Sequence, residues 1–204
     1  MLHFANEGDT TDQQPQKERF PVAIRDVQKE NQEHEVDSRF FNNKYPPVYY
    51  SPGMHRLAAV SAFGDSVELE DGSVWKVSPY DASKVAFFTS QDPIVITQNH
   101  RWFSKYQYKL INQSTGASLE TNLHLGPIKD GAYTLYVIGV DTIRGEVILS
   151  DQTRWGISSY DFSDFQDWIL YDAIIIGHNS GWDSGCQGLL INVTLNSSVR
   201  AEQF

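Results

Sequence analysis

Residues 67–77 read Val-Glu-Leu-Glu-Asp-Gly-Ser-Val-Trp-Lys-Val, and this stretch decides the fold. Apolar and polar residues alternate on both sides of Asp71-Gly72, a pair that is a strong hairpin-turn signal. The pattern predicts two short strands that each bury one face. Trp75 in the return strand is large enough to fill the centre of a small core.

The same pattern returns 80 residues later, over 147–157, and the correspondence extends without a gap over 57–119 and 137–199. The matched positions include Asp71/Asp151, Trp75/Trp155, Tyr80-Asp81/Tyr160-Asp161, Asp92/Asp172, Asn99/Asn179, Trp102/Trp182 and Asn112/Asn192. Self-similarity at a fixed offset is typical of a repeated structural unit.

The rest of each unit is also strand-like, apart from one helical turn after the hairpin. We expect first strands at 57–62 and 136–141, helical turns at 78–85 and 158–165, doubly covered strands at 94–96 and 174–176, and closing pairs at 106–112 with 117–123 and 187–195 with 197–203. So many short strands in so few residues favour a small closed barrel. The predicted fold class is mainly β, a tandem duplication of a small SH3-like or OB-like β-barrel with one short helical turn per repeat.

The predicted organisation separates a polar arm from two barrels. The arm is 1–54, the first barrel 55–124, a short linker 125–133 and the second barrel 134–204. The arm is too poor in apolar residues to fold alone, and we expect 1–18 to be disordered, while 19–24 docks as an extended piece. Because the linker is short, the two barrels are expected to touch.

Composition limits the partners. The net charge is −10 at pH 7, so the chain repels phosphate backbones and anionic lipids, and we expect no nucleic-acid partner. No run of about 20 apolar residues exists, so no transmembrane segment is expected. Cys186 is the single cysteine and cannot form an intramolecular disulfide.

Two repeated pairs, each an aspartate with an aromatic residue, have both a structural and a functional interpretation. Asp71 with Trp75 is typical of a turn residue followed by a core anchor, which we favour; the alternative is an acidic site for a sugar or cationic peptide. Asp81 is expected to cap the helical turn while Tyr80 covers the barrel end, and Asp161 with Tyr160 to do the same; the alternative is a pair of acids in a cleft.

The loops after Asn99 and Asn179 keep one tryptophan each and otherwise differ. The first is basic and aromatic, and the second is small and acidic. Aromatic residues beside an arginine are typical of binding hot spots. The candidate binding residues are Arg101, Trp102, Phe103, Tyr106 and Trp182; the alternative is that these rings pack over the barrel mouth.

No catalytic or cofactor motif is visible. His178, Asp183 and Cys186 are metal-donor types, but the first repeat has Gln98, Phe103 and Tyr106 there, so we expect no metal site. The chain has no glycine-rich phosphate loop and no recognisable nucleophile arrangement, so we expect no cofactor and favour a protein that is not an enzyme.

Residues 67–77, with Asp-Pro-Ile-Val-Ile at 92–96, resemble a small module of uncharacterised bacterial exported or envelope proteins of the chlamydial type. The resemblance covers 65–100 well and 145–180 loosely, and it implies a periplasmic or secreted location, with the export signal outside the sequence given. We expect a non-enzymatic binding or structural module of the envelope that recognises a protein or polymer. The alternatives are a hydrolase of an envelope polymer that uses Asp71 and Asp81, or a secreted effector that binds a host protein.

Overall fold

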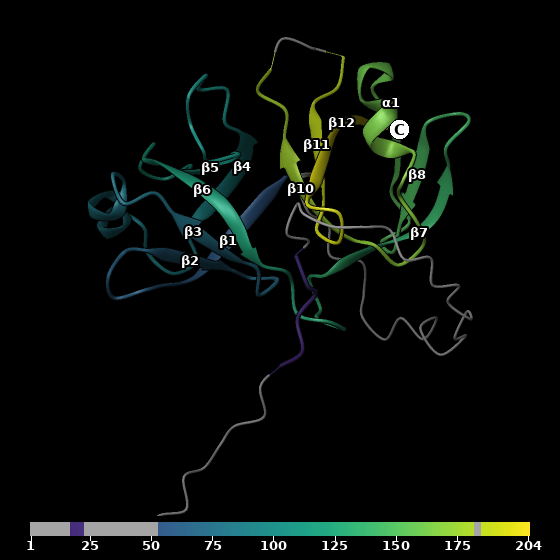
Figure 1. The fold of residues 1–204 in the computed structure, drawn as a ribbon. Helices are drawn as coiled ribbons and strands as arrows, with labels where there is room; N and C mark the ends of the chain where they lie inside the picture. Colours follow the sequence, from purple (N-terminus) through teal and green to yellow (C-terminus); the bar gives the residue numbers. More distant parts are fainter. Residues whose placement is uncertain (1–16, 23–52, 182–184) are drawn as a thin grey trace, which may run out of the picture.

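A computed structural model of the chain describes residues 17–22, 53–181 and 185–204. The structure is mainly β, and its first half forms a closed six-stranded antiparallel barrel (Figure 1). Its elements are β1 (Met54–Val60), β2 (Ser66–Leu69), β3 (Val74–Val77), the 3-10 helix η2 (Ala82–Phe87), β4 (Pro93–Gln98), β5 (Tyr108–Asn112) and β6 (Ser118–Leu125).

The second half has the same succession of strands. Its elements are β7 (Leu135–Asp141), β8 (Glu146–Leu149), β9 (Arg154–Ile157), the 3-10 helix η3 (Ser159–Asp161), α1 (Phe162–Phe165), β10 (Ala173–His178), β11 (Gly188–Asn192) and β12 (Ser197–Gln203). The predicted helical turn after the second hairpin is therefore confirmed, as a short 3-10 helix followed by one α-helical turn.

Strand order is the same in both halves. The first runs β1-β2-β3-β6-β5-β4 and the second β7-β8-β9-β12-β11-β10. Pairing of β1 with β4 closes the first barrel, and pairing of β7 with β10 closes the second. Closure leaves few exposed strand edges, which is how small β proteins avoid edge-to-edge association.

Each barrel has a core around one fully buried tryptophan. Trp75 is 0% and Trp155 1% exposed, which confirms the prediction that both are core anchors. Trp75 meets Tyr108 edge-on, with ring centroids 5.5 Å apart. Phe88 and Trp168, which occupy matched positions after the helical turns, are also buried and belong to the two cores.

The hairpin at 67–77 has a longer loop than a two-residue turn. Residues 70–73 connect β2 to β3, and Gly72 adopts the left-handed conformation with φ +82°. Gln152, at the matched position, adopts φ +70° although it has a Cβ atom. The second turn therefore forms with the same backbone, against a local steric preference.

The two barrels share a joint, as the short linker predicts. β4 and β10 run parallel and pair at Thr97 and His178. Ile174 belongs to the core of the second barrel while Ile175 packs with that of the first, which explains the continuous apolar run. A Cβ atom at Gly177 would lie 2.7 Å from the carbonyl oxygen of Ile96, so only glycine allows this approach.

The docked piece of the arm lies against the linker. Phe20 exchanges backbone hydrogen bonds with Gly126 and Pro127, and its ring centroid lies 5.6 Å from that of Tyr136. Docking is therefore confirmed for residues 19–22, and residues 23 and 24 lie outside the described residues. Glu18, expected to be disordered, accepts a hydrogen bond from the backbone of Lys129, so the docked piece begins earlier than predicted.

Candidate functional site

Two matched loops lie at the same end of the molecule, because β4 and β10 run parallel (Figure 1). The loop at 99–107 joins β4 to β5, and the loop at 179–187 joins β10 to β11. A Cβ atom at Gly181 would lie 3.7 Å from the ring of His100, so the loops approach each other closely. Trp182, one of the five candidate binding residues, lies outside the described residues.

One repeated asparagine holds each loop closed at its base. The Asn99 side-chain amide donates to the carbonyl of Tyr106 at 2.9 Å and accepts from the backbone N–H of Arg101 at 3.2 Å. In the second loop the partners of Asn179 are Cys186 and Gly181, at 2.7 and 2.9 Å. The asparagine is therefore part of the loop's architecture, which leaves the residues between these bonds free to vary.

The first loop is tied to β6, while its tip is exposed. Arg101 forms an ion pair with Glu120 at 2.8 Å, and Ser104 donates to the other oxygen of the same carboxylate at 3.1 Å. Burial would raise the pKa of Glu120, but these two partners hold that pKa below its usual value. Trp102 is 90% and Phe103 95% exposed, so neither ring packs over the barrel mouth.

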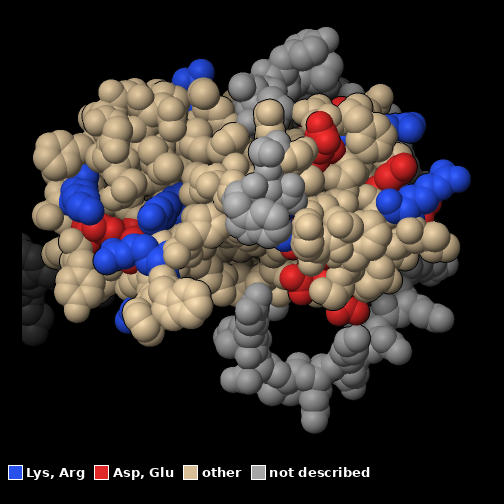
Figure 2. Space-filling model, turned by 90° about the horizontal axis from the view of Figure 1, so that it is seen from above, with Lys and Arg blue, Asp and Glu red and all other residues tan. Residues whose placement is uncertain are grey.

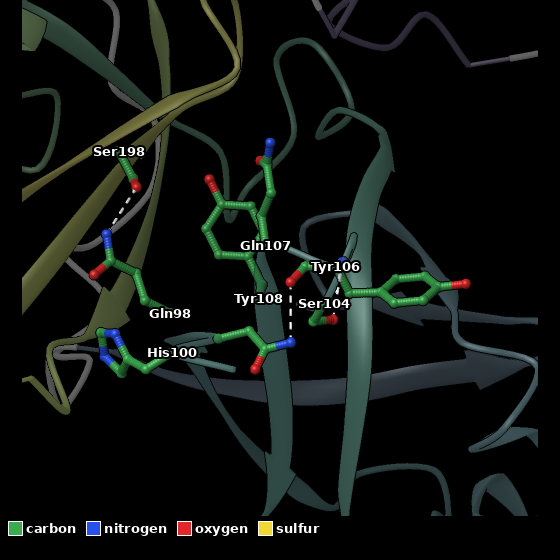
Figure 3. Close-up of a pocket in the computed structure, with 8 residues that line it drawn as sticks. Gln98, His100, Ser104, Tyr106, Gln107, Tyr108 and Ser198 are labelled. Carbon is green, nitrogen blue, oxygen red and sulfur yellow. Dashed lines mark hydrogen bonds between the residues drawn. The ribbon is translucent and has the colours of Figure 1, made fainter. Parts of the chain in front are cut away.

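The remaining candidate, Tyr106, lines a pocket of about 390 Å³ beside this loop (Figure 3). The ring of Tyr106 is half-buried, and the ammonium of Lys105 lies 5.6 Å from its centroid. Gln98 at the end of β4 donates to Ser198 of β12 at 3.3 Å, so both barrels contribute to the pocket. The structure thus brings Tyr106 to a cavity that the sequence analysis did not foresee.

Figure 2 shows this end of the molecule from above. Over the first barrel, Lys and Arg side chains border a small acidic group, and much of the remaining face is uncharged. Arg101 and Lys105 belong to the first loop, while the chain as a whole carries a net charge of −10. The loop therefore differs in charge from the average surface.

The side chains of Asp71 and Trp75 both form hydrogen bonds within the hairpin, so Asp71 does not form an exposed acidic site. Asp71 accepts from the backbone N–H of Ser73 at 2.8 Å, and the Trp75 indole donates to the Ser73 hydroxyl at 2.9 Å. Burial raises the pKa of Asp71, which is only 5% exposed. The same bonds recur among Asp151, Thr153 and Trp155.

The predicted helix cap at Asp81 is wrong. Its side chain makes no capping bond and instead accepts from the backbone N–H of Glu120 in β6 at 2.8 Å, with Lys84 at 2.7 Å. Burial opposes ionisation, but these partners lower the pKa of Asp81. Asp161 makes the matching bond to Arg200, at 2.7 Å, and likewise does not cap its helix.

Tyr80 and Tyr160 do not cover the barrel ends, because they are 93% and 66% exposed. Buried aromatic residues instead follow the helical turns, at the matched positions Phe88 and Trp168. The sequence comparison missed this because Phe and Trp do not match as identical letters at the fixed offset.

A further matched pair links the helical turn to β5. The Asn112 side chain donates to Asp92 at 2.6 Å, and Asp92 also accepts from the backbone of Thr89 at 2.7 Å. The same contacts join Asn192, Asp172 and Ile169. The matched residues Asp71/Asp151, Asp92/Asp172 and Asn99/Asn179 thus make the same structural bonds in both halves.

One buried ionisable cluster has no counterpart in the second half. His55 bonds through Nδ1 to Glu70 at 3.0 Å and through Nε2 to the carbonyl of Ile176, in the other barrel, at 2.7 Å. Burial by itself would lower the pKa of His55, but the hydrogen bond and charge of Glu70, with Asp71 nearby, raise it to about 9. The matched residues are Leu135 and Ser150, so this joint is specific to the first barrel.

Within the described ranges, no three His, Cys, Asp or Glu side chains are grouped to hold a metal ion, and no helix has the length and apolar character that a membrane crossing requires. Asp183 lies outside those ranges. No protein-family model, curated protein or solved structure matches the chain.

Proposed function

We propose that the chain is a non-enzymatic binding or structural module of the bacterial envelope, and that the β4–β5 loop recognises its partner. The observation that carries this proposal is the exposed pair Trp102 and Phe103 on a loop whose base is fixed. Exposed aromatic rings on a rigid support bind with little loss of conformational entropy.

The proposal includes an origin for the architecture. We propose that the two barrels are copies of one small SH3-like or OB-like unit. Identical strand order and the matched bonds of Asp71/Asp151 and Asp92/Asp172 support this. Copies that keep their structural residues are free to diverge at their loops, and the loops at 99–107 and 179–187 are where these two differ.

The hydrolase alternative requires two carboxylates in one open cleft. Asp71 is buried against Ser73, and Asp81 is bound to the backbone of β6 and to Lys84. Both acids are engaged in the hairpin and the barrel wall, so we prefer the binding module. A periplasmic or secreted location is part of the proposal and rests on the resemblance of 65–100 to exported envelope proteins.

The test compares how much partner is captured from extract by the wild type and by a variant that changes only exposed side chains. Trp102→Ala with Phe103→Ala removes two exposed rings, so we expect an unchanged melting temperature and a loss of whatever the wild type captures from bacterial envelope extract. The control is Phe63→Ala, which removes a ring that is 88% exposed in the β1–β2 turn. Equal capture by the double variant and the control would refute recognition by this loop.

A further inference from the structure

The pocket beside the β4–β5 loop has the size of a ligand site. Its volume of about 390 Å³ falls within the range of small-molecule pockets, roughly 300–1,000 Å³. Gln98 of β4 donates a hydrogen bond to Ser198 of β12, so the second barrel contributes one residue to the wall of the pocket (Figure 3).

The lining is polar and consists of amides, hydroxyls and one imidazole. Among the described residues it contains amides from Gln98, Asn99 and Gln107, hydroxyls from Ser104, Ser198 and the two tyrosines, and the imidazole of His100. No Asp, Glu, Lys or Arg side chain lines it within those residues. On a chain with a net charge of −10, a pocket lined by no carboxylate is a local exception.

Several of these groups are available to a ligand. The side chains of His100 and Gln107 make no hydrogen bond to any described residue, and Gln98 uses only its amino group, on Ser198. Amides offer donors and acceptors together, which is the pairing that a hydroxyl needs. A ligand with many hydroxyl groups would satisfy both kinds of partner.

Charged ligands fit less well. An anion would need a cation in the lining, but Arg101 is paired with Glu120 at 2.8 Å, the ammonium of Lys105 lies over the Tyr106 ring, and neither residue lines the pocket. A cation would need a carboxylate, and the described lining offers none. An extended peptide that binds by strand addition would need an open edge, and both barrels are closed by β1–β4 and β7–β10 pairing.

We infer that this pocket binds a neutral oligosaccharide, with the amides of Gln98 and Gln107 bonded to sugar hydroxyls and an aromatic ring of the adjoining loop covering a sugar face. Tyr106 lines the pocket, and Trp102, 90% exposed, stands in the same loop. The inference rests on the proposed function, because it names the ligand class for the same end of the molecule.

The test is isothermal titration calorimetry of the full chain with maltotetraose, cellotetraose and chitotetraose. Tetragalacturonate serves as the acidic comparison. We expect at least one neutral tetrasaccharide to bind and the acidic one not to bind. Gln107→Ala removes an exposed side chain and should weaken binding about tenfold, the loss expected for one hydrogen-bonding group.

Two further variants separate the possible outcomes. Gln98→Ala should weaken binding to a similar extent, and Phe63→Ala should leave it unchanged. Absence of binding by every neutral probe, preferred binding of the acidic probe, or wild-type affinity in both glutamine variants would overturn the inference. If no sugar binds but Trp102→Ala with Phe103→Ala still abolishes partner capture, the proposed function stands and only the ligand class is wrong.

Discussion

The bond from His55 across the barrel joint predicts a pH dependence of folding. Nε2 must donate to the carbonyl of Ile176, at 2.7 Å, while Nδ1 faces the carboxylate of Glu70 at 3.0 Å. An imidazole with both nitrogens facing acceptors is stabilised in its protonated form. The His55 side chain is only 12% exposed, so water screens this charge weakly.

The size of the effect follows from the pKa of His55, which is about 9 in the folded chain against 6.5 for a histidine in water. This difference corresponds to about 3 kcal/mol of stability. Because the folded pKa is raised, the contribution is fully present below about pH 6.5 and is lost as pH rises through about 9. Folding should therefore weaken with rising pH over this window.

The assay is urea unfolding between about pH 6 and about pH 10, followed by fluorescence of the buried tryptophans. The matched variant combines His55→Leu with Glu70→Ser, which installs the residues found at the equivalent positions Leu135 and Ser150. All other ionisable groups are shared, so the difference between the two pH profiles isolates the pair. An identical dependence on pH in wild type and double variant would refute the reasoning.

Three further predictions concern stability. Trp75→Ala and Trp155→Ala should each cost roughly 3–5 kcal/mol in urea unfolding, and unchanged stability with lost ligand binding would instead make these rings recognition residues. Gly177→Ala should destabilise the chain by more than about 1 kcal/mol, because its Cβ atom would lie 2.7 Å from the backbone of β4. The control Gly156→Ala should be tolerated, because the nearest atom to its Cβ lies at 3.5 Å. Equal melting temperatures of the two variants would contradict this reasoning. Gln152→Gly should stabilise the second hairpin by about 0.5–1 kcal/mol by relieving its φ of +70°, and a lower melting temperature would show that the turn is unstrained.

Local patterns in the sequence predicted the local structure well. Alternation around Asp71-Gly72 located β2, β3 and the turn between them, and the apolar run at 174–176 located a strand buried on both faces. These features depend on neighbours in the chain, so one stretch of sequence carries the information. The burial of Trp75 followed from the same alternation.

Long-range contacts could not be predicted in the same way. Asp81 bonds to Glu120, 39 residues away, and His55 bonds to Ile176, 121 residues away, because barrel closure and the β4–β10 joint bring them together. The pocket also depends on Ser198 of the other barrel. No spacing in the sequence predicts these contacts.

The most direct test of the central claim is site-specific photocrosslinking in envelope extract. A benzophenone amino acid would replace Trp102 in one protein and Ile143 in another; both side chains are about nine-tenths exposed, at 90% and 91%, but Ile143 lies in the β7–β8 turn of the second barrel. Recognition by the β4–β5 loop predicts a crosslinked partner at position 102 and none at position 143. A partner captured at 143 and not at 102 would contradict it.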